Sequence, residues 1–227
     1  MRLLWVRHGQ MAVRATTVDD PRAIDRFFDQ EEQGSLSSRG RREAARVAAR
    51  LADEGVVGLY SSPLIRARET AEVSAEALGL EVRVTDAINE VRTGKLRPGS
   101  PEQRWVRAMT ASQLPPALRR PLLGLSLIPL YLHAWRTGRT VGGERPADVD
   151  ARLAGFYREL EARHADRDAV ALFSHGYLLV TLTFGLGLRG RAALLRRPYI
   201  PNGAICEMIL RRGRLRLVRH ADQRHLR

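Results

Sequence analysis

Short apolar runs alternate along the chain with longer segments whose apolar residues recur at helical spacing. Buried strands are predicted for the short runs, at residues 2–6, 56–60, 81–84 and 169–173. Helices are predicted for the longer segments, at residues 39–54, 64–78 and 146–163 and from just after Gly176 to about Phe184. Such alternation is typical of a mostly parallel sheet with helices on both faces. We therefore expect an α/β fold with three layers, α/β/α.

Turn-forming residues separate these elements. Gly55 and Gly79 end the first two helices, because glycine adopts the left-handed conformation that commonly terminates a helix. Near the C-terminus, residues 205–210 and 214–219 are apolar-rich and flank the tripeptide "RRG". This pattern predicts a β-hairpin.

Two segments fall outside the strand–helix pattern. Residues 13–35 are polar and predict a loop with one short helix at 23–28. Residues 93–143 are rich in Pro, Arg and Leu, too apolar for a plain linker and too often interrupted by proline for one helix. We expect a single domain over residues 1–227, with 93–143 as a lid or insertion within it. The apolar stretch 121–132 stays open to another interpretation, as a contact for a membrane or a partner.

Polar residues follow three of the predicted strands. Arg7-His8-Gly9 follows the first, Ser61-Ser62 the second and Ser174-His175-Gly176 a later one, and Arg66 lies one turn into the helix after Ser62. In parallel sheets, ligands bind at the carboxyl ends of the strands. We therefore expect these residues to meet at one edge of the sheet.

Composition limits the classes of function. The 227 residues carry a formal net charge of +13, almost all of it from arginine, with Lys95 the only lysine. This excess favours anionic partners such as phosphorylated substrates, nucleic acid or a membrane surface; a genome-level bias toward arginine codons explains it equally well. The single cysteine, Cys206, lies in an apolar run and is expected in the core, so no intramolecular disulfide forms. We expect no signal peptide, no transmembrane segment and a cytoplasmic location.

Several motifs together resemble the histidine phosphatase superfamily, also called the phosphoglycerate mutase-like family. They occur in the family's order and leave only residues 10–35 and 97–140 unmatched. The matching segments are "RHG" (7–9), "LSSRGRREA" (36–44), "SSPLIRARETA" (61–71), "INEVRTGKL" (88–96), "VGGERPADVDARLAGF" (141–156), "SHG" (174–176) and the C-terminal stretch from "PNGAICEMI" to "LRLVRHADQRHL" (201–226).

The resemblance implies a phosphatase that uses no metal and no cofactor. His8 would be the nucleophile that forms a phosphohistidine, His175 a second imidazole that donates to the phosphoryl oxygens, and Glu90 the general acid. The phosphate-binding residues would be Arg7, Arg66, Gly9 and Gly176. Two flanking guanidiniums would also keep His8 neutral near pH 7. Two alternatives stay open: Arg68 in place of Arg66, and Glu144 in place of Glu90.

Some residues depart from the family's pattern. Where relatives often continue with Thr or Ser and then an Asn that contacts phosphate, this chain reads "RHGQMAV"; where they often carry an Arg after the second histidine, it reads "SHGYLLVTLTF". A more apolar pocket favours a phosphatase over a phosphoglycerate mutase. A third hypothesis is a phosphate- or nucleic-acid-binding module without turnover, although no nucleic-acid motif is present. We expect a small phosphorylated substrate, chosen by residues 10–35 and 93–140, and the sequence does not give the oligomeric state.

Overall fold

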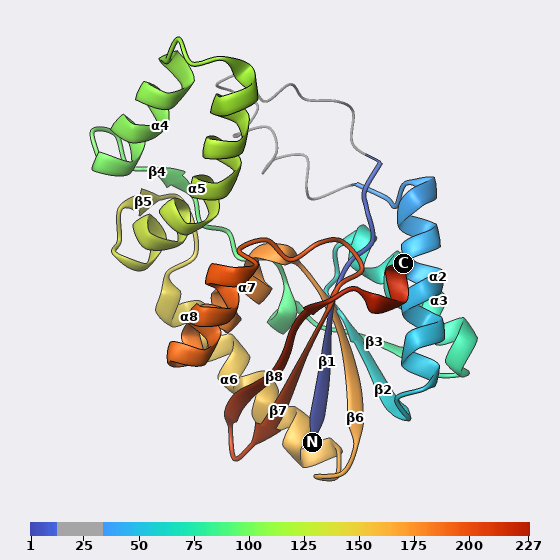
Figure 1. Ribbon diagram of the computed structural model, residues 1–227. Coiled ribbons are helices and arrows are strands. Elements are labelled where there is room, and N and C mark those ends of the chain that lie inside the picture. The colour runs from blue at the N-terminus through green and yellow to red at the C-terminus, as the bar shows by residue number, and fades with distance from the viewer. Residues whose placement is uncertain (13–33) are drawn as a thin grey trace. The chain divides into compact units, whose positions relative to one another are not determined.

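The computed structural model describes residues 1–12 and 34–227 (Figure 1). The short helix predicted at 23–28 lies outside the described residues. The chain divides into two compact units. The described part of the first comprises residues 1–12, 34–90 and 151–227, and that of the second comprises residues 91–150.

The first unit is built on a six-stranded sheet with strand order β3-β2-β6-β1-β7-β8. β1, β2, β3 and β6 run parallel to one another, whereas β7 is antiparallel to β1 and β8 is antiparallel to β7. The strands are β1 (Arg2–Arg7), β2 (Val56–Ser61), β3 (Val82–Val84), β6 (Ala169–Ser174), β7 (Ile205–Arg211) and β8 (Arg214–Asp222). The predicted mostly parallel sheet and its C-terminal hairpin are confirmed.

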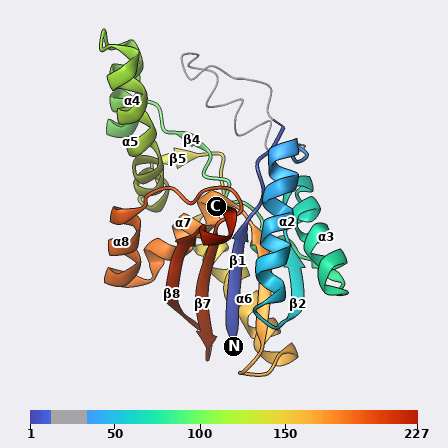
Figure 2. The ribbon, with the colours of Figure 1, turned by 45° about the vertical axis from the view of Figure 1, so that its right-hand side comes forward.

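Helices cover both faces of this sheet (Figures 1 and 2). α2 (Ser38–Ala52) and α3 (Ile65–Leu78) lie on one face, while α6 (Pro146–Arg163), α7 (Gly176–Gly185) and α8 (Gly187–Arg196) lie on the other. Two short 3-10 helices, η1 (Asp86–Ile88) and η2 (Arg224–Leu226), complete the described elements of this unit. The three-layer α/β/α architecture is therefore confirmed.

Alternating side chains of the strands supply two separate apolar layers. On the α2 and α3 face, one core cluster joins strand residues to both helices: Leu4, Val6, Val47, Leu51, Leu59, Ala71, Ala171, Phe173 and Ile205. On the other face, the Tyr60 ring of β2 lies edge-on to Phe156 of α6, with ring centroids 5.4 Å apart. Burial on both faces explains why these strands read as continuous apolar runs.

Capping residues set the ends of the elements. The Ser37 hydroxyl accepts a hydrogen bond from Gly40 N (3.0 Å) at the start of α2, and Gly79 ends α3 with φ of 65°. At the hairpin between β7 and β8, Arg212 and Gly213 both have positive φ, 51° and 69°. Such a pair of left-handed residues matches the twist of the flanking strands.

The second unit contains a small sheet and two helices. β4 (Lys95–Leu96) and β5 (Thr140–Val141) pair in antiparallel fashion, and α4 (Pro101–Ala111) and α5 (Pro116–Arg136) lie between them in sequence. Buried Glu102 accepts a hydrogen bond from Arg139 Nη1 (2.8 Å), and buried Trp135 donates from Nε1 to Glu144 O (2.6 Å). The prediction that this segment is not one helix is confirmed, because α4 and α5 are separate helices. Within the described ranges, no helix combines the length and apolar character that crossing a bilayer requires.

Candidate active site

The two predicted histidines meet at the carboxyl edge of the sheet. β1 and β6 are adjacent and parallel, with Arg7 opposite Ser174, so the residues that follow these strands are brought side by side. The ring centroids of His8 and His175 lie 5.3 Å apart, with 56° between the ring planes. Both side chains are buried. Two imidazoles that are 167 positions apart in the sequence therefore share one site.

The hydrogen bonds of His8 assign its tautomer. Its Nδ1 lies 2.7 Å from the carbonyl of Gly9, which can only accept, so Nδ1 carries the proton. Its Nε2 accepts from Nε of Arg66 at 3.1 Å, because a guanidinium can only donate. Burial, followed by the charges of Arg7 and Arg66, holds the pKa of His8 well below its ordinary value. The ring is therefore neutral near pH 7, with its lone pair on Nε2.

Arg66 is anchored within α3. Its side chain is fully buried, and its carbonyl accepts from the Thr70 hydroxyl (2.7 Å), which in turn accepts from Gly9 N (3.0 Å). Thr70 thus ties the loop that follows β1 to the helix that carries the guanidinium. The alternative residue, Arg68, is half exposed and pairs with Glu72 (3.4 Å). Of the two, Arg66 is the arginine that contacts His8.

Arg7 is held from several directions. Its Nη1 donates to the carbonyl of Ile200, and its guanidinium carbon lies 4.8 Å from the ring centroid of Tyr199, a cation–π geometry. A Cβ on Gly176 would approach Cζ and Nε of Arg7 to 3.0 Å, so a side chain at that position would displace the guanidinium. Arg7 Nε is buried and has no hydrogen-bond partner within residues 1–12 and 34–227. This arrangement leaves a cationic N–H able to receive an anion.

A chain of hydrogen bonds orients His175. Its Nε2 lies 2.7 Å from the Ser62 hydroxyl, and that hydroxyl donates to Oδ1 of Asn89 (3.1 Å). Glu90 N also donates to Asn89 Oδ1 (2.9 Å), which identifies that atom as the amide oxygen. Since the serine proton points to Asn89, His175 must donate through Nε2. Its buried Nδ1 has no partner among the described residues.

The pKa of His175 is lowered for similar reasons. Burial contributes most, and the next largest contributions include the charges of Arg66, Arg7 and Arg152. Neutral His175 with its proton on Nε2 has a bare lone pair at Nδ1. A bound dianion would counteract the nearby cations and favour a proton at this atom.

Glu90 lies at the N-terminus of α7. Its carboxylate accepts hydrogen bonds from Tyr177 N (3.2 Å) and Leu178 N (2.8 Å). Two N–H groups in the first turn of this helix thus face a carboxylate of the protein itself. The alternative acid, Glu144, belongs to the second unit, where it accepts from Arg92 N (3.0 Å).

Arg152 on α6 was not recognised from the sequence. It donates through Nη1 to the carbonyl of Ala87 (2.6 Å) and through Nη2 to that of Asn89 (3.1 Å). One guanidinium thereby joins α6 to the turn that precedes Glu90. No local pattern distinguishes this arginine from the others on the helix, because its partners are backbone carbonyls 63 to 65 positions away.

Two glycines allow the backbone behind His8 to pack closely. A Cβ on Gly9 would fall 2.5 Å from the carbonyl oxygen of Gly40, and a Cβ on Gly40 would fall 2.1 Å from that of Gln10. Both distances are far below van der Waals contact. At Gly9, the group that approaches this closely is the main chain of α2.

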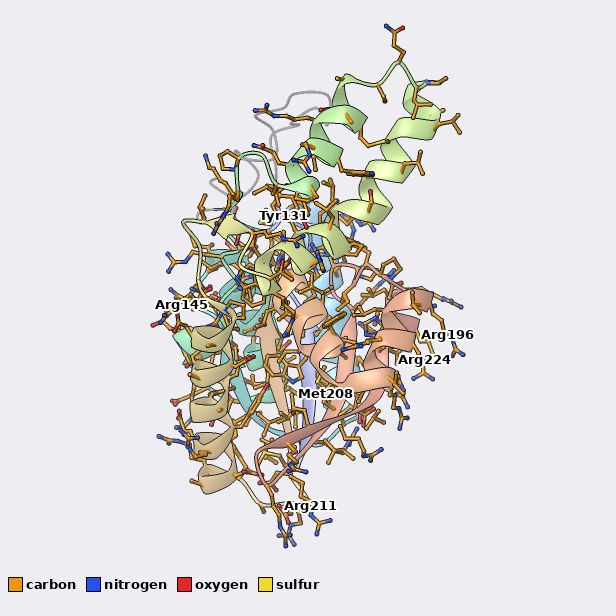
Figure 3. All side chains as sticks on the ribbon, turned by 90° about the vertical axis from the view of Figure 1, so that its left-hand side faces the viewer. Tyr131, Arg145, Arg196, Met208, Arg211 and Arg224 are labelled. Carbon is orange, nitrogen blue, oxygen red and sulfur yellow. The ribbon has the colours of Figure 1, made fainter. Side chains whose placement is uncertain are left out.

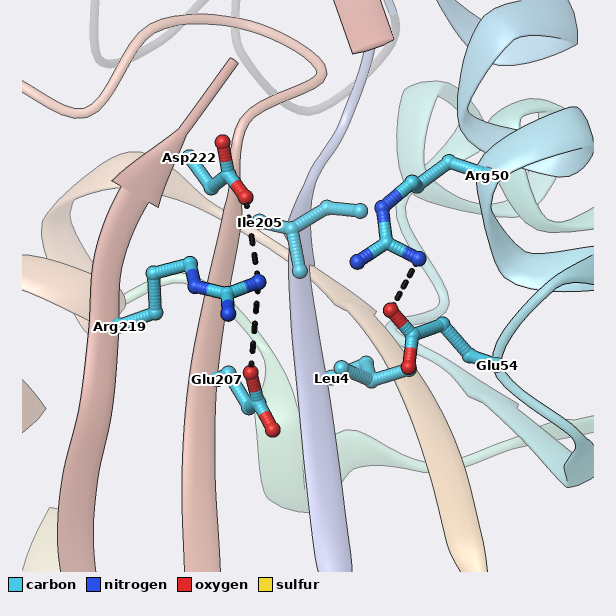
Figure 4. A pocket seen from close by; sticks show the side chains of 7 residues that line it. All are labelled: Leu4, Arg50, Glu54, Ile205, Glu207, Arg219 and Asp222. Atoms are coloured by element: carbon cyan, nitrogen blue, oxygen red, sulfur yellow. Dashed lines mark ion pairs between the residues drawn. The ribbon is translucent and has the colours of Figure 1, made fainter. Parts of the chain in front are cut away.

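A small pocket lies elsewhere in the first unit (Figure 4). It is lined by Leu4, Arg50, Glu54, Ile205, Glu207, Arg219 and Asp222. Opposite charges alternate around it: Arg219 lies 3.7 Å from Glu207 and 3.5 Å from Asp222, and Arg50 pairs with Glu54. Arg2, which pairs with Glu54 and lies 3.1 Å from Glu207, supplies a third cation for the three carboxylates. We therefore interpret the pocket as an ion-pair network that connects the end of α2 to the sheet.

Comparison with known proteins agrees with this arrangement. A family model described as the histidine phosphatase superfamily (branch 1) matches residues 3–115 and 127–223. It therefore also covers the segment 10–35 and much of 97–140, which the motifs had left unmatched. A probable phosphoglycerate mutase GpmB of Salmonella paratyphi A is 26% identical over 180 residues, which is 79% of this chain and 71% of that protein. A match to the Serratia proteamaculans protein of the same name is 29% identical and spans about half of each chain (50% and 46%).

Solved structures show the same fold over nearly the whole length. A mycobacterial glucosyl-3-phosphoglycerate phosphatase in complex with inorganic phosphate has a TM-score of 0.65 and 26% identity, covering 99% of this chain and 98% of that one. A putative alpha-ribazole-5'-P phosphatase from Escherichia coli, 18% identical, covers 99% and 97% with a TM-score of 0.61. With the family model matching most of its length, the chain belongs to the histidine phosphatase superfamily, branch 1.

Proposed function

We propose that the protein is a phosphomonoesterase that transfers a phosphoryl group first to Nε2 of His8 and then to water. The observation that carries this proposal is the pair of hydrogen bonds that places the proton of His8 on Nδ1, toward Gly9, and its lone pair on Nε2, toward Arg66. A neutral imidazole with an available lone pair is the form that can attack phosphorus.

Arg7 and Arg66 would bind the substrate phosphate. A phosphate monoester is a dianion near pH 7, and planar guanidiniums bind its oxygens through paired N–H groups. When substrate binds, the Nε–H of Arg66 would stop donating to Nε2 of His8 and would donate to a phosphoryl oxygen instead. This change frees the lone pair of Nε2 for attack on phosphorus. Gly9 and Gly176 would keep side chains away from this space.

His175 would stabilise the charge that develops on the phosphoryl group. The dianion favours protonation of the imidazole at Nδ1, since an opposite charge raises a histidine pKa. Nδ1–H then donates to a phosphoryl oxygen while Nε2–H remains bonded to Ser62. Donors fixed in this way before the reaction are worth most in the transition state.

Glu90 would act as general acid and then as general base. In the first step, Nε2 of His8 forms a bond to phosphorus, the phosphorus–oxygen bond to the leaving group breaks, and Glu90 gives its proton to the departing oxygen. In the second step, water attacks phosphorus and gives a proton to Glu90. The nitrogen–phosphorus bond breaks, and the lone pair returns to Nε2.

A phosphoglycerate mutase is the second candidate, because the curated relatives carry that name. Both reactions share the phosphohistidine and differ in what accepts its phosphoryl group. The 26% identical mycobacterial phosphatase, which matches along 98% of its own chain, supports hydrolysis. We also propose, from the sequence, that residues 93–143 form an insertion within one domain and help to select a small phosphorylated substrate.

The test compares wild type with His8→Asn on an aryl phosphate. We expect the variant to stay folded and to lose activity by on the order of 10⁴-fold or more. Brief reaction of wild type with labelled substrate should leave acid-labile label on the protein, and His8→Asn should leave none. Ordinary turnover by the variant would refute the proposal. Interconversion of phosphoglycerate isomers faster than phosphate release would indicate the mutase, and phosphate binding without any turnover would indicate a binding module.

A further inference from the structure

The outer face of α8 exposes two leucines. Leu188 is 84% exposed and Leu195 is 87% exposed, the highest values for a large apolar side chain in the described part of the chain. They are seven positions apart, and exposed Ala192 lies between them at the fourth position. Residues at this spacing lie on one side of a helix. The result is a short apolar ridge that faces solvent.

Arginines border this ridge on both sides. By helical geometry, Arg189 and Arg196 flank it on one side and Arg191 on the other, and all three are exposed. Figure 3 shows Arg196 extending outward at the end of the helix. Residues 169–206 contain four arginines and no aspartate or glutamate. The face is therefore both apolar and strongly cationic.

The exposed leucines and the arginines around them together indicate which kind of partner can bind this face. A second copy docked through the same face would bring arginine against arginine, since a twofold interface repeats one surface. Nucleic acid would satisfy the arginines but offers nothing to two aliphatic side chains. An anionic bilayer offers acyl chains to the leucines and phosphate-bearing headgroups to the arginines.

We propose that the outer face of α8, comprising Leu188, Ala192 and Leu195 with Arg189, Arg191 and Arg196, docks on the surface of an anionic bilayer. The helix would lie parallel to the surface, with its leucines at the headgroup boundary and its arginines among the headgroups. Because only two large apolar side chains enter, the attachment is shallow and reversible. This proposal does not rest on the proposed function, since docking requires no turnover.

The test measures binding of the whole protein to vesicles by co-sedimentation. We expect binding to vesicles of phosphatidylcholine with phosphatidylglycerol, none to vesicles of phosphatidylcholine alone, and weaker binding as salt is raised. The double variant Leu188→Ser/Leu195→Ser should reduce the partition coefficient by about tenfold or more, because it removes two buried aliphatic groups. Arg189→Gln/Arg196→Gln should reduce it roughly tenfold.

A matched pair of exposed apolar residues provides the control. Val57 on β2 and Val84 on β3 are 51% and 52% exposed, so Val57→Ser/Val84→Ser should leave vesicle binding unchanged. All three double variants should retain the wild-type circular dichroism and hydrolyse a soluble aryl phosphate at the wild-type rate.

Three results would overturn the proposal. The first is an equal loss of vesicle binding in the valine control. The second is a concentration-dependent dimer that the leucine variant abolishes. The third is binding to a DNA oligonucleotide while anionic vesicles leave the protein in the supernatant.

Discussion

Nε of Arg66 lies 3.1 Å from Nε2 of His8, so this contact joins the residue that follows the first strand to the helix that follows the second. Burial, followed by the charges of Arg7 and Arg66, keeps this imidazole neutral, and the Arg66 guanidinium also orients its lone pair. In the proposed mechanism, the same side chain would therefore orient the attacking imidazole and bind the phosphate.

Replacing Arg66 with lysine should therefore be severe. A lysine keeps the charge but lacks the planar fork that can contact both an imidazole nitrogen and phosphoryl oxygens. We expect kcat/KM for an aryl phosphate to fall by about 10²- to 10³-fold. Arg68→Lys is the matched control, because Arg68 pairs with Glu72 on the surface of the same helix. Equal activity of the two variants would exclude a special role for Arg66.

Ser62→Ala should remove the hydrogen bond that orients His175. The substitution removes the partner of His175 Nε2 and leaves that buried N–H unsatisfied, which costs about 1–3 kcal/mol of folding free energy. A ring that is less well oriented should also lower kcat by roughly tenfold or more. Denaturant titration measures the first effect and steady-state kinetics the second. Ser74→Ala, which removes another buried serine hydroxyl of the same unit, should leave kcat unchanged.

In the proposed mechanism, Arg152 would position Glu90, and its effect should depend on the leaving group. Arg152→Lys loses the bridge between the carbonyls of Ala87 and Asn89, so Glu90 is held less firmly. An alkyl phosphate needs the proton from Glu90, whereas a nitrophenyl phosphate has a good leaving group and needs it much less. We expect kcat to fall about tenfold for the alkyl ester and less than about twofold for the nitrophenyl ester.

Arg163→Lys is the control for this comparison, since Arg163 lies on the same helix and pairs with Glu159 near the surface. A loss at Arg152 that is the same for both esters would indicate a general structural defect and would contradict the positioning role.

Acid should weaken the fold in a pH range that the buried histidines set. The pKa values of His8 and His175 lie well below the ordinary value of 6.5 in the folded protein. Below pH 6.5 the unfolded chain therefore binds protons that the folded protein does not, so stability is lost as the pH falls. Each imidazole should contribute about 1.4 kcal/mol per pH unit in this range. Denaturant unfolding between pH 5 and 8 measures the slope, and His8→Asn should reduce it.

The low pKa of His8 also predicts how kcat/KM changes at acidic pH. In the proposed mechanism His8 must be neutral to attack phosphorus, and its lowered pKa favours the neutral form. Its protonation should therefore cause no fall in kcat/KM between pH 7.5 and 6. A fall centred on 6.5 that Glu90→Gln leaves unchanged would contradict the buried, neutral His8.

The strand-end residues could be predicted because their position follows from local patterns. An apolar run that stops at Arg7-His8-Gly9 and another that stops at Ser174-His175-Gly176 reach the same edge of any parallel sheet. Asn89 and Arg152 could not be predicted, since each acts through a contact between distant segments. α8 was not predicted, for a different reason. Gly187 and Gly190 have low helix propensity. In addition, Leu188 and Leu195 face solvent, so the spacing of apolar residues does not indicate a helix that packs on the core.

The ion-pair network in Figure 4 should respond to loss of Glu54. Burial alone would raise the pKa of Glu54, but its hydrogen bond from Arg2 and the charges of Arg50 and Arg2 lower it overall. Such a carboxylate contributes stability above its ordinary pKa of 4.5 and loses that contribution as the pH falls through the folded value. Glu54→Gln should cost on the order of 2 kcal/mol at pH 7 and less at pH 4.

Glu76→Gln, at an exposed position of α3, is the control and should change little. Equal destabilisation by Glu54→Gln at pH 7 and pH 4 would show that its effect is steric.

The contact between Gly9 and Gly40 also limits how this enzyme can change over generations. Neither position accepts even a methyl group, because the opposing main chain already occupies that space. A lineage that acquires a new substrate must therefore conserve this junction and accumulate its substitutions in other segments. Substitutions that change the substrate would therefore lie in segments other than the one around Gly9 and Gly40.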